Sequence, residues 1–245
     1  MLDATEAAAT LAAGEITSEE LVASCLERIA QRDGEIGAWT HVDPDYALTQ
    51  ARDADTDGRG LLRGIPVGIK DIFDTADMPT EYGSAIHEGH RPDRDMACVA
   101  ALRAAGAVIL GKTTTTEFAS PVPVGVVNPR AQDRSPGVSS SGSAAAVADH
   151  MVPITLGSQT GGSMIMPASS CGVFGYKASL DGINRTGLRH IRPTLDTIGI
   201  FARSVADIAL AHAAITGSPL VSLDRDHLAP RIGLCRTPAW ETAEP

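Results

Sequence analysis

The stretch from residue 151 to residue 169 constrains the fold more than any other part of the chain. Its first piece, MVPITLG, is apolar and rich in β-branched residues, which predicts a buried strand. SQTGGS ends that strand with two glycines, and SMIMPAS then predicts a short helix. Ser163 therefore stands at a strand-to-helix turn, where a serine side chain is exposed.

The backbone of this turn predicts an anion-binding site. The N–H groups of Thr160, Gly161, Gly162 and Ser163 can converge at the start of the helix, where the helix dipole favours a developing negative charge. Ser163 is thus a candidate nucleophile with an oxyanion hole. A flexible Gly/Ser linker is the alternative, but a linker would not alternate with the helical run SAAAVADH and an apolar strand. No Gly-Lys-Ser/Thr follows either glycine run, which excludes a phosphate-binding loop.

A second candidate residue lies at the end of another predicted strand. In GIPVGIK, Ile65, Val67 and Ile69 alternate with smaller or polar residues, and the strand ends at Lys70. Burial disfavours the charged form of a lysine, lowers its pKa and can make it a general base. Two other interpretations stay open on the residues alone: a lysine whose head reaches water from the strand end, or an ion pair with Asp71.

The remaining segments alternate between helices and strands. Gly14 ends a first helix, and Thr17 with Glu20 forms a capping box for a second. Helices are predicted at 45–54, 95–106 and 204–216, and further strands at 107–111 and 231–235. We interpret Lys112 and Glu117 as structural polar residues. This alternation predicts an α/β fold with a mixed, mostly parallel central sheet covered by helices.

The composition excludes several classes of protein. The formal net charge is −10, which argues against nucleic acid or an anionic membrane as the main partner. The four cysteines are widely spaced and show no metal-binding pattern, so we expect no metal. No run approaches the ~20 apolar residues of a membrane helix, and no leader opens the sequence, so we expect a cytoplasmic protein without a membrane partner.

Three motifs carry a resemblance to a known family. PGVSSSGSAAAVAD, LGSQTGGSMIMPASSCGVFGYK and GIPVGIKDIF resemble the amidase signature family, serine hydrolases that cleave carboxylic amides. The resemblance implies one amidase signature domain over residues 1–245, with helices on both faces of the sheet. It places a helical scaffold at 1–60 and a catalytic core at 61–203. Members of the family continue further, so the C-terminal part of the fold is expected to be missing.

The resemblance also implies a mechanism. Ser163 would attack the carbonyl of a linear amide, Ser139 would relay its proton, and Lys70 would accept it, in a Ser-cisSer-Lys triad without cofactor. The products would be an acid and ammonia or an amine, formed from a small-molecule substrate. The chain departs from the family pattern at Val138, where glycine normally precedes the relay serine.

Two alternatives remain at this level. A Ser-His-Asp triad could use His150 or His190, but their spacing to the serines does not support it. A non-catalytic or partner-dependent relative, including an amidotransferase-type subunit, is the second alternative. Its partner would be a C-terminal segment that completes the fold, or another copy of the chain.

Overall fold

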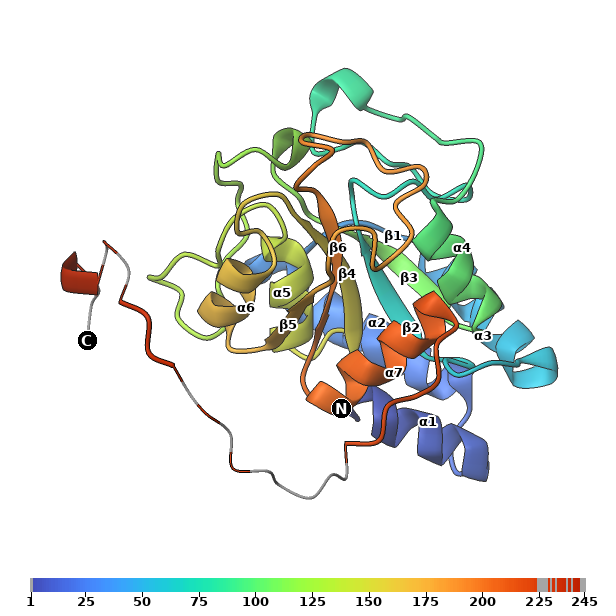
Figure 1. Cartoon of the computed structure of the whole chain (residues 1–245). Coiled ribbons are helices and arrows are strands. Elements are labelled where there is room, and N and C mark those ends of the chain that lie inside the picture. Colours follow the sequence, from blue (N-terminus) through green and yellow to red (C-terminus); the bar gives the residue numbers. More distant parts are fainter. Residues whose placement is uncertain are drawn as a thin grey trace.

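A six-stranded sheet forms the centre of the computed structural model, which describes residues 2–223, 229, 231, 233–236, 238 and 240–242. Figure 1 shows the sheet with helices packed around it. The strands are β1 (Trp39–Val42), β2 (Pro66–Lys70), β3 (Val108–Thr113), β4 (Ile154–Gln159), β5 (Phe174–Lys177) and β6 (Thr197–Ala202). The α-helices are α1 (Ala4–Ala13), α2 (Ser18–Ile36), α3 (Pro44–Asp57), α4 (Ala97–Ala104), α5 (Ser141–Ala148), α6 (Ile165–Cys171) and α7 (Val205–Thr216). Three 3₁₀ turns lie at Ala85–His87, Glu117–Ala119 and Trp240–Thr242.

The strand order is β1-β3-β2-β4-β6-β5. β2 runs parallel to both β3 and β4, whereas β1 pairs with β3, and β6 with β4 and β5, in the antiparallel sense. Four strands, β2 to β5, therefore point the same way, and the predicted mixed, mostly parallel sheet is confirmed. The carboxyl ends of β2, β3 and β4 consequently lie at one edge of the sheet, where side chains that follow these strands can meet.

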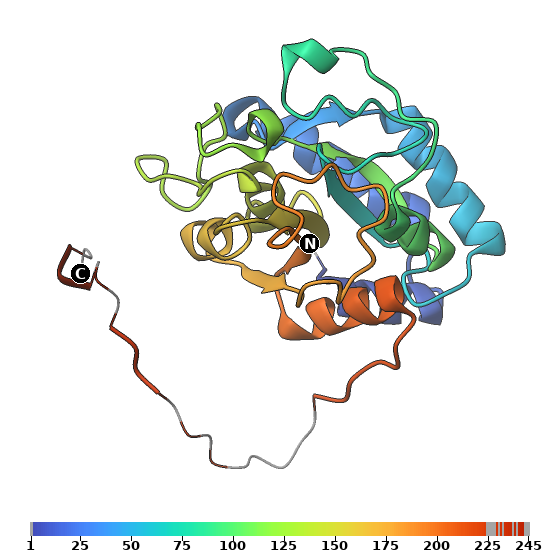
Figure 2. The same ribbon diagram turned by 45° about the horizontal axis from the view of Figure 1, so that its top comes forward.

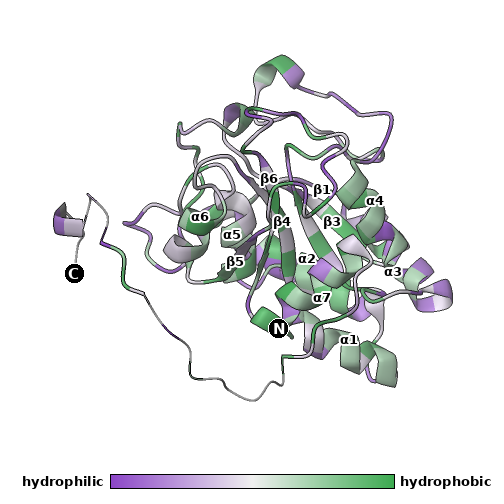
Figure 3. Cartoon of the chain, viewed as in Figure 1, coloured by the Kyte–Doolittle hydropathy of each residue, from purple (hydrophilic) through white to green (hydrophobic). Residues whose placement is uncertain are grey.

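The helices cover both faces of the sheet, as predicted (Figures 1 and 2). One buried cluster joins α1, α4 and α7 to side chains such as Val67, Ile69 and Leu156. The other joins α2, α3, α5 and α6 to Leu110 and Phe201. Strands and covering helices carry most of the hydrophobic residues (Figure 3). Among the described helices, none combines the length and apolarity of a membrane-spanning segment.

The register of β3 against β2 is irregular at one point. Val67 pairs with Ile109, but the next residue, Gly68, pairs with Gly111. Leu110 is therefore an extra residue in β3, and its buried side chain packs into the cluster around α2, α3 and α5. Beyond this bulge, Lys70 at the end of β2 lies opposite Thr113.

The predicted helix boundaries agree with the observed caps. Thr17 accepts a hydrogen bond from Glu20 N, and the Glu20 carboxylate accepts one from Thr17 N, which is the predicted capping box. α1 ends at Gly14 in the left-handed conformation, and α7 is capped by Ser204 and ends at Gly217.

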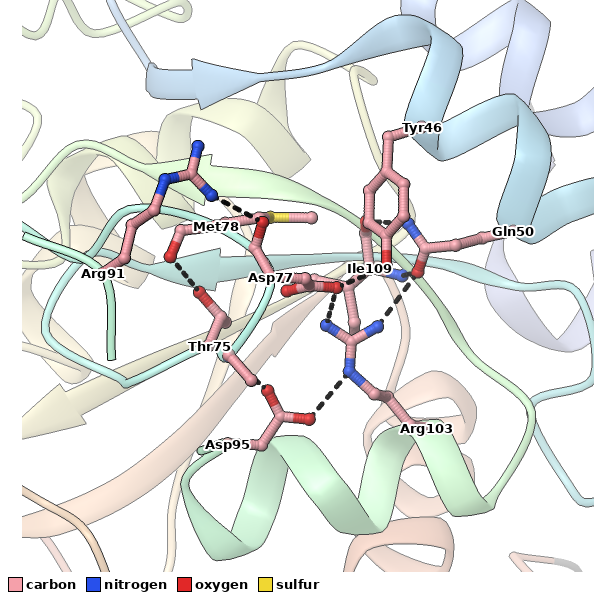
Figure 4. Close-up of polar contacts among 10 residues, drawn as sticks. Tyr46, Gln50, Thr75, Asp77, Met78, Arg91, Asp95, Arg103 and Ile109 are labelled. Carbon is pink, nitrogen blue, oxygen red and sulfur yellow. Dashed lines mark hydrogen bonds and ion pairs between the residues drawn. The ribbon is translucent and has the colours of Figure 1, made fainter. Parts of the chain in front are cut away.

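Arg103 ties α4 to the segment before it and to α3. Its guanidinium donates to the carboxylates of Asp77 and Asp95 and to the side-chain oxygen of Gln50 (Figure 4). Tyr46 donates its hydroxyl to Asp77 at 2.8 Å. The charged side chains of Arg103, Asp77 and Asp95 are half-buried, and each charge is paired. The cluster therefore holds the long loop after β2 in place.

Three observed strands were not predicted. β1 and β5 are only four residues long, and β6 lies in a segment whose Gly, Pro and Asn content indicates loops. For the strand predicted at 231–235, residue 232 lies outside the described residues, and the described positions there are not in a strand.

Candidate functional site

Lys70 and two adjacent serines meet at the carboxyl edge of the sheet. The Lys70 Nζ lies 2.8 Å from Ser139 Oγ, 2.9 Å from Ser140 Oγ and 3.0 Å from Ser158 Oγ. Ser139 and Ser140 immediately precede α5, and Ser158 is on β4. All four side chains are buried, and Lys70 is fully so. The sequence prediction paired Lys70 with Ser139, and these two residues are in contact.

Burial lowers the pKa of Lys70 well below its ordinary value. The groups around the amine are hydroxyls, and no carboxylate among the described residues forms an ion pair with it. No opposite charge among the described residues therefore offsets the cost of burying the charged form, and burial shifts the equilibrium toward the neutral amine.

The neighbouring Asp71 pairs with a different lysine. Its carboxylate lies 3.1 Å from the Nζ of Lys112, and both side chains are almost completely buried. Burial raises the pKa of Asp71 and lowers that of Lys112, and the attraction between the two opposes both shifts. The interpretation of Lys70 as half of an ion pair with Asp71 is therefore wrong, because Lys112 is the partner of that carboxylate.

The turn between β4 and α6 has the predicted strand–glycine–helix form. Gln159 Oε1 accepts hydrogen bonds from Met164 N (2.8 Å) and Ile165 N (3.2 Å), which fixes the first turn of α6. Within residues 2–223, the backbone N–H groups of residues 160–163 donate to no protein acceptor. Ser163 is half-buried, so its hydroxyl is accessible.

Ser163 and Ser139 are not joined by a hydrogen bond in the described part of the chain. The described peptide bonds are all trans, so the cis bond implied for the relay serine is not present in this structure. Ser139 nevertheless keeps its contact with Lys70 without it.

Asp196, immediately before β6, links this turn to the loop that precedes the strand. One of its carboxylate oxygens accepts from Thr160 Oγ1, and the other accepts from Ile191 N at 2.7 Å. His190 Nδ1 lies 3.4 Å from the same carboxylate. Neither His190 nor His150 hydrogen-bonds a serine in the described residues, which gives a histidine triad no support.

Sequence reasoning did not single out Ser140 and Ser158 as partners of Lys70. Ser140 Oγ also donates to Ser158 O at 3.1 Å, so these two residues join the start of α5 to β4. The serine triplet was the available signal for Ser140, whereas Ser158 depends on how β4 is aligned with β2. Among the described residues, no group of three His, Cys, Asp or Glu side chains is placed to hold a metal ion.

Comparisons with known proteins agree with this architecture. The Amidase family model matches residues 20–231. The A subunit of glutamyl-tRNA(Gln) amidotransferase from Acidothermus cellulolyticus is 44% identical over 225 residues, which cover 87% of this chain and 45% of that protein. The native peptide amidase from Stenotrophomonas maltophilia superimposes with a TM-score of 0.81 and 36% identity, over 87% of this chain and 47% of the peptide amidase.

A further solved structure is described as an unexpected vestigial protein complex that reveals the evolutionary origins of an s-triazine catabolic enzyme. It gives a TM-score of 0.83 and 32% identity, over 98% of this chain and 54% of its own. The chain thus spans about half the length of the curated relatives it matches. The family match covers most of the chain, and the resemblance seen in the three motifs is confirmed: the chain belongs to the Amidase family.

Proposed function

We propose that this chain hydrolyses a carboxylic amide, with Ser163 as nucleophile, Ser139 as proton relay and Lys70 as base. The observation that carries the proposal is the environment of Lys70, a fully buried amine surrounded by three serine hydroxyls and separated from the ion pair of its neighbour Asp71. A purely structural buried lysine is expected to have a carboxylate partner, as Lys112 has.

The hydrogen-bonding capacity of a neutral amine fits this environment. It has two N–H donors and one lone pair, and three hydroxyls lie around it. The Ser140 proton is used by the carbonyl of Ser158, so Ser140 can only accept from Lys70. Ser139 and Ser158 remain as hydroxyls that can donate to the lone pair. Ser139 thus lies at hydrogen-bond distance from the amine to which it would pass a proton.

The proposed reaction has two stages. Ser163 Oγ attacks the amide carbonyl carbon while its proton passes to Ser139, whose own proton passes to Lys70. The proton returns through Ser139 to the leaving nitrogen, the C–N bond breaks, and water then hydrolyses the acyl ester. The free N–H groups of residues 160–163 would bind the oxyanion of each tetrahedral intermediate.

Reaction with a fluorophosphonate, read by intact mass, tests this assignment. We expect one adduct on the parent, none on Ser163→Ala, and slow formation on Lys70→Ala. Ser169→Ala is the matched control, because Ser169 is an exposed serine on α6 itself. Labelling of Ser163→Ala at the parent's rate would refute the choice of nucleophile.

Exposed apolar side chains on the edge strand β5 and on α6 favour a second candidate function. In this function the protein works only together with a partner chain. Phe174 and Tyr176 on β5, with Ile165 and Met166 on α6, are exposed by 36% to 52%. Such an edge can be covered by another polypeptide. Relatives that are named as components of an amidotransferase fit this function too. A folded parent that forms no adduct alone, but gains one with a partner chain, would support this second function.

A further inference from the structure

A cavity of about 220 Å³ lies beside the loop that precedes β6. Its lining combines the apolar or aromatic side chains of Ile72, Tyr82, Phe118 and Ile191 with the polar Arg189 and His190. In Figures 1 and 2 the orange loop that contains Arg189 lies over the same part of the molecule as the teal segment that contains Tyr82. The cavity is therefore built from segments far apart in sequence.

Arg189 is placed in this cavity as an anion receptor would be. Its guanidinium carbon lies 4.9 Å from the ring centre of Tyr82 and 4.7 Å from that of Phe118. Nη1 lies 2.8 Å from His87 Nε2, and since a guanidinium can only donate, the histidine nitrogen accepts. Across the described ranges, no carboxylate forms an ion pair with Arg189. The two rings hold the guanidinium plane, and the remaining N–H groups stay available.

The backbone of the aromatic wall is strained. Five non-glycine residues in the described chain have positive φ, and three of them, Tyr82 (55°), Phe118 (48°) and Ala119 (55°), line this cavity. Such conformations are strained and cluster at binding sites. Phe118 N donates to Tyr82 O at 2.8 Å, and the Tyr82 hydroxyl donates to Asp74 at 2.7 Å. These bonds fix both rings against Arg189, and Asp74 is engaged by Tyr82.

The cavity is connected to the candidate catalytic residues through two elements. Ile72 in its wall follows Lys70 by two residues. On the other side, Asp196 accepts hydrogen bonds from both Thr160 and Ile191 N, which ties the turn before Ser163 to the loop that carries Arg189. The loop that lines the cavity and the turn that leads to Ser163 are therefore held together by one carboxylate.

We propose that this cavity binds a carboxylate group of the substrate, so that the preferred substrates are monoamides of dicarboxylic acids. The Arg189 guanidinium binds the carboxylate as a two-pronged donor, while Ile72 and Ile191 contact the alkyl chain that leads to the amide. This inference rests on the proposed amidase function, because it assigns the far end of the same substrate.

The test compares charged and neutral amides of equal length. Succinamate, glutaramate and adipamate are each paired with the neutral amide that ends in a methyl group: butanamide, pentanamide and hexanamide. We expect kcat/KM of the parent to favour at least one charged member, and Arg189→Gln to lower that preference roughly 10- to 100-fold while the neutral amides change little. Arg189→Lys should retain part of it. Arg192→Gln, which changes an exposed arginine of the same loop, is the matched control.

A binding measurement separates this inference from the proposed function. Calorimetric titration of succinate and glutarate into Ser163→Ala, with and without Arg189→Gln, needs no turnover. Binding that is lost with Arg189→Gln would support the carboxylate site even if no amide is hydrolysed. Hydrolysis of neutral amides without any preference for charged ones, or equal dicarboxylate binding in both forms, would overturn the carboxylate site and leave the amidase standing.

Discussion

Replacement of Lys70 by methionine tests whether the proposed base is neutral in the folded protein. Methionine has a similar length and no charge, and the chain has only three lysines, so the change isolates one titrating group. Burial lowers the pKa of Lys70 well below 10.5, whereas the same lysine in the unfolded chain has an ordinary pKa. The two states therefore bind different numbers of protons over a wide range of pH.

The expected magnitude follows from this difference. Where the unfolded lysine carries a proton and the folded one does not, the free energy of unfolding of the parent rises with pH by about 1.4 kcal/mol per unit. This contribution is complete above the unfolded pKa and is lost as pH falls toward the folded pKa. Lys70→Met lacks it. Over each pH unit between the folded and the unfolded pKa, the stability of the variant relative to the parent should fall by about 1.4 kcal/mol.

Urea denaturation at a series of pH values from 7 to 10 measures both curves. Groups other than Lys70 titrate in both proteins and cancel in the difference. Lys177→Met is the control, because Lys177 lies on the exposed edge strand β5, and its curve should run parallel to that of the parent. Parallel curves for the parent and Lys70→Met would refute the neutral amine, and with it the role of Lys70 as base.

Three further predictions concern what supports the site. Lys112→Met should lower the free energy of unfolding by about 3–5 kcal/mol, because it leaves Asp71 charged and buried. Adding Asp71→Leu should recover much of this loss in urea denaturation. Absence of any recovery would show that the loss does not come from the unpaired carboxylate. Gly68→Ala should lower the free energy of unfolding by about 1–3 kcal/mol in the same assay, since the added Cβ would lie 2.8 Å from the Trp39 ring. An unchanged denaturation midpoint would show that the ring can move. Thr17→Ala should cost about 1 kcal/mol through the lost cap of α2 without changing the rate of fluorophosphonate labelling; a slower rate would mean that α2 shapes the site.

Much of the fold could be predicted because local signals and tertiary structure agree. Thr17, Ser204 and Gly217 bound helices where the sequence indicates, and the alternation around Val67 marks a strand. β6 could not be predicted in this way. The Gly, Pro and Asn residues of the segment before it indicate loops, and Gly199 itself resembles a turn residue. The structure gives another reason for that glycine: a Cβ would collide with the carbonyl oxygen of Tyr176 on β5.

The candidate site was predictable only in part. Contact between Lys70 and Ser139 was expected from the resemblance to a family, not from spacing. The contacts of Lys70 with Ser140 and Ser158, and the pairing of Asp71 with Lys112, depend on the register of β2, β3 and β4. No local pattern encodes that register. The roles of Ser139 and Ser163 in a proton relay remain predictions.

The bulge at Leu110 limits how this chain can vary. Side chains alternate between the faces of a strand, so losing or gaining one residue in β3 would turn Lys112 away from Asp71. The same slip would move Thr113 from its place opposite Lys70. An insertion or deletion within β3 would therefore break both contacts. Chimeras between this chain and longer relatives should be joined outside residues 108–113, since a junction that alters the length of this strand would disturb both lysines at once.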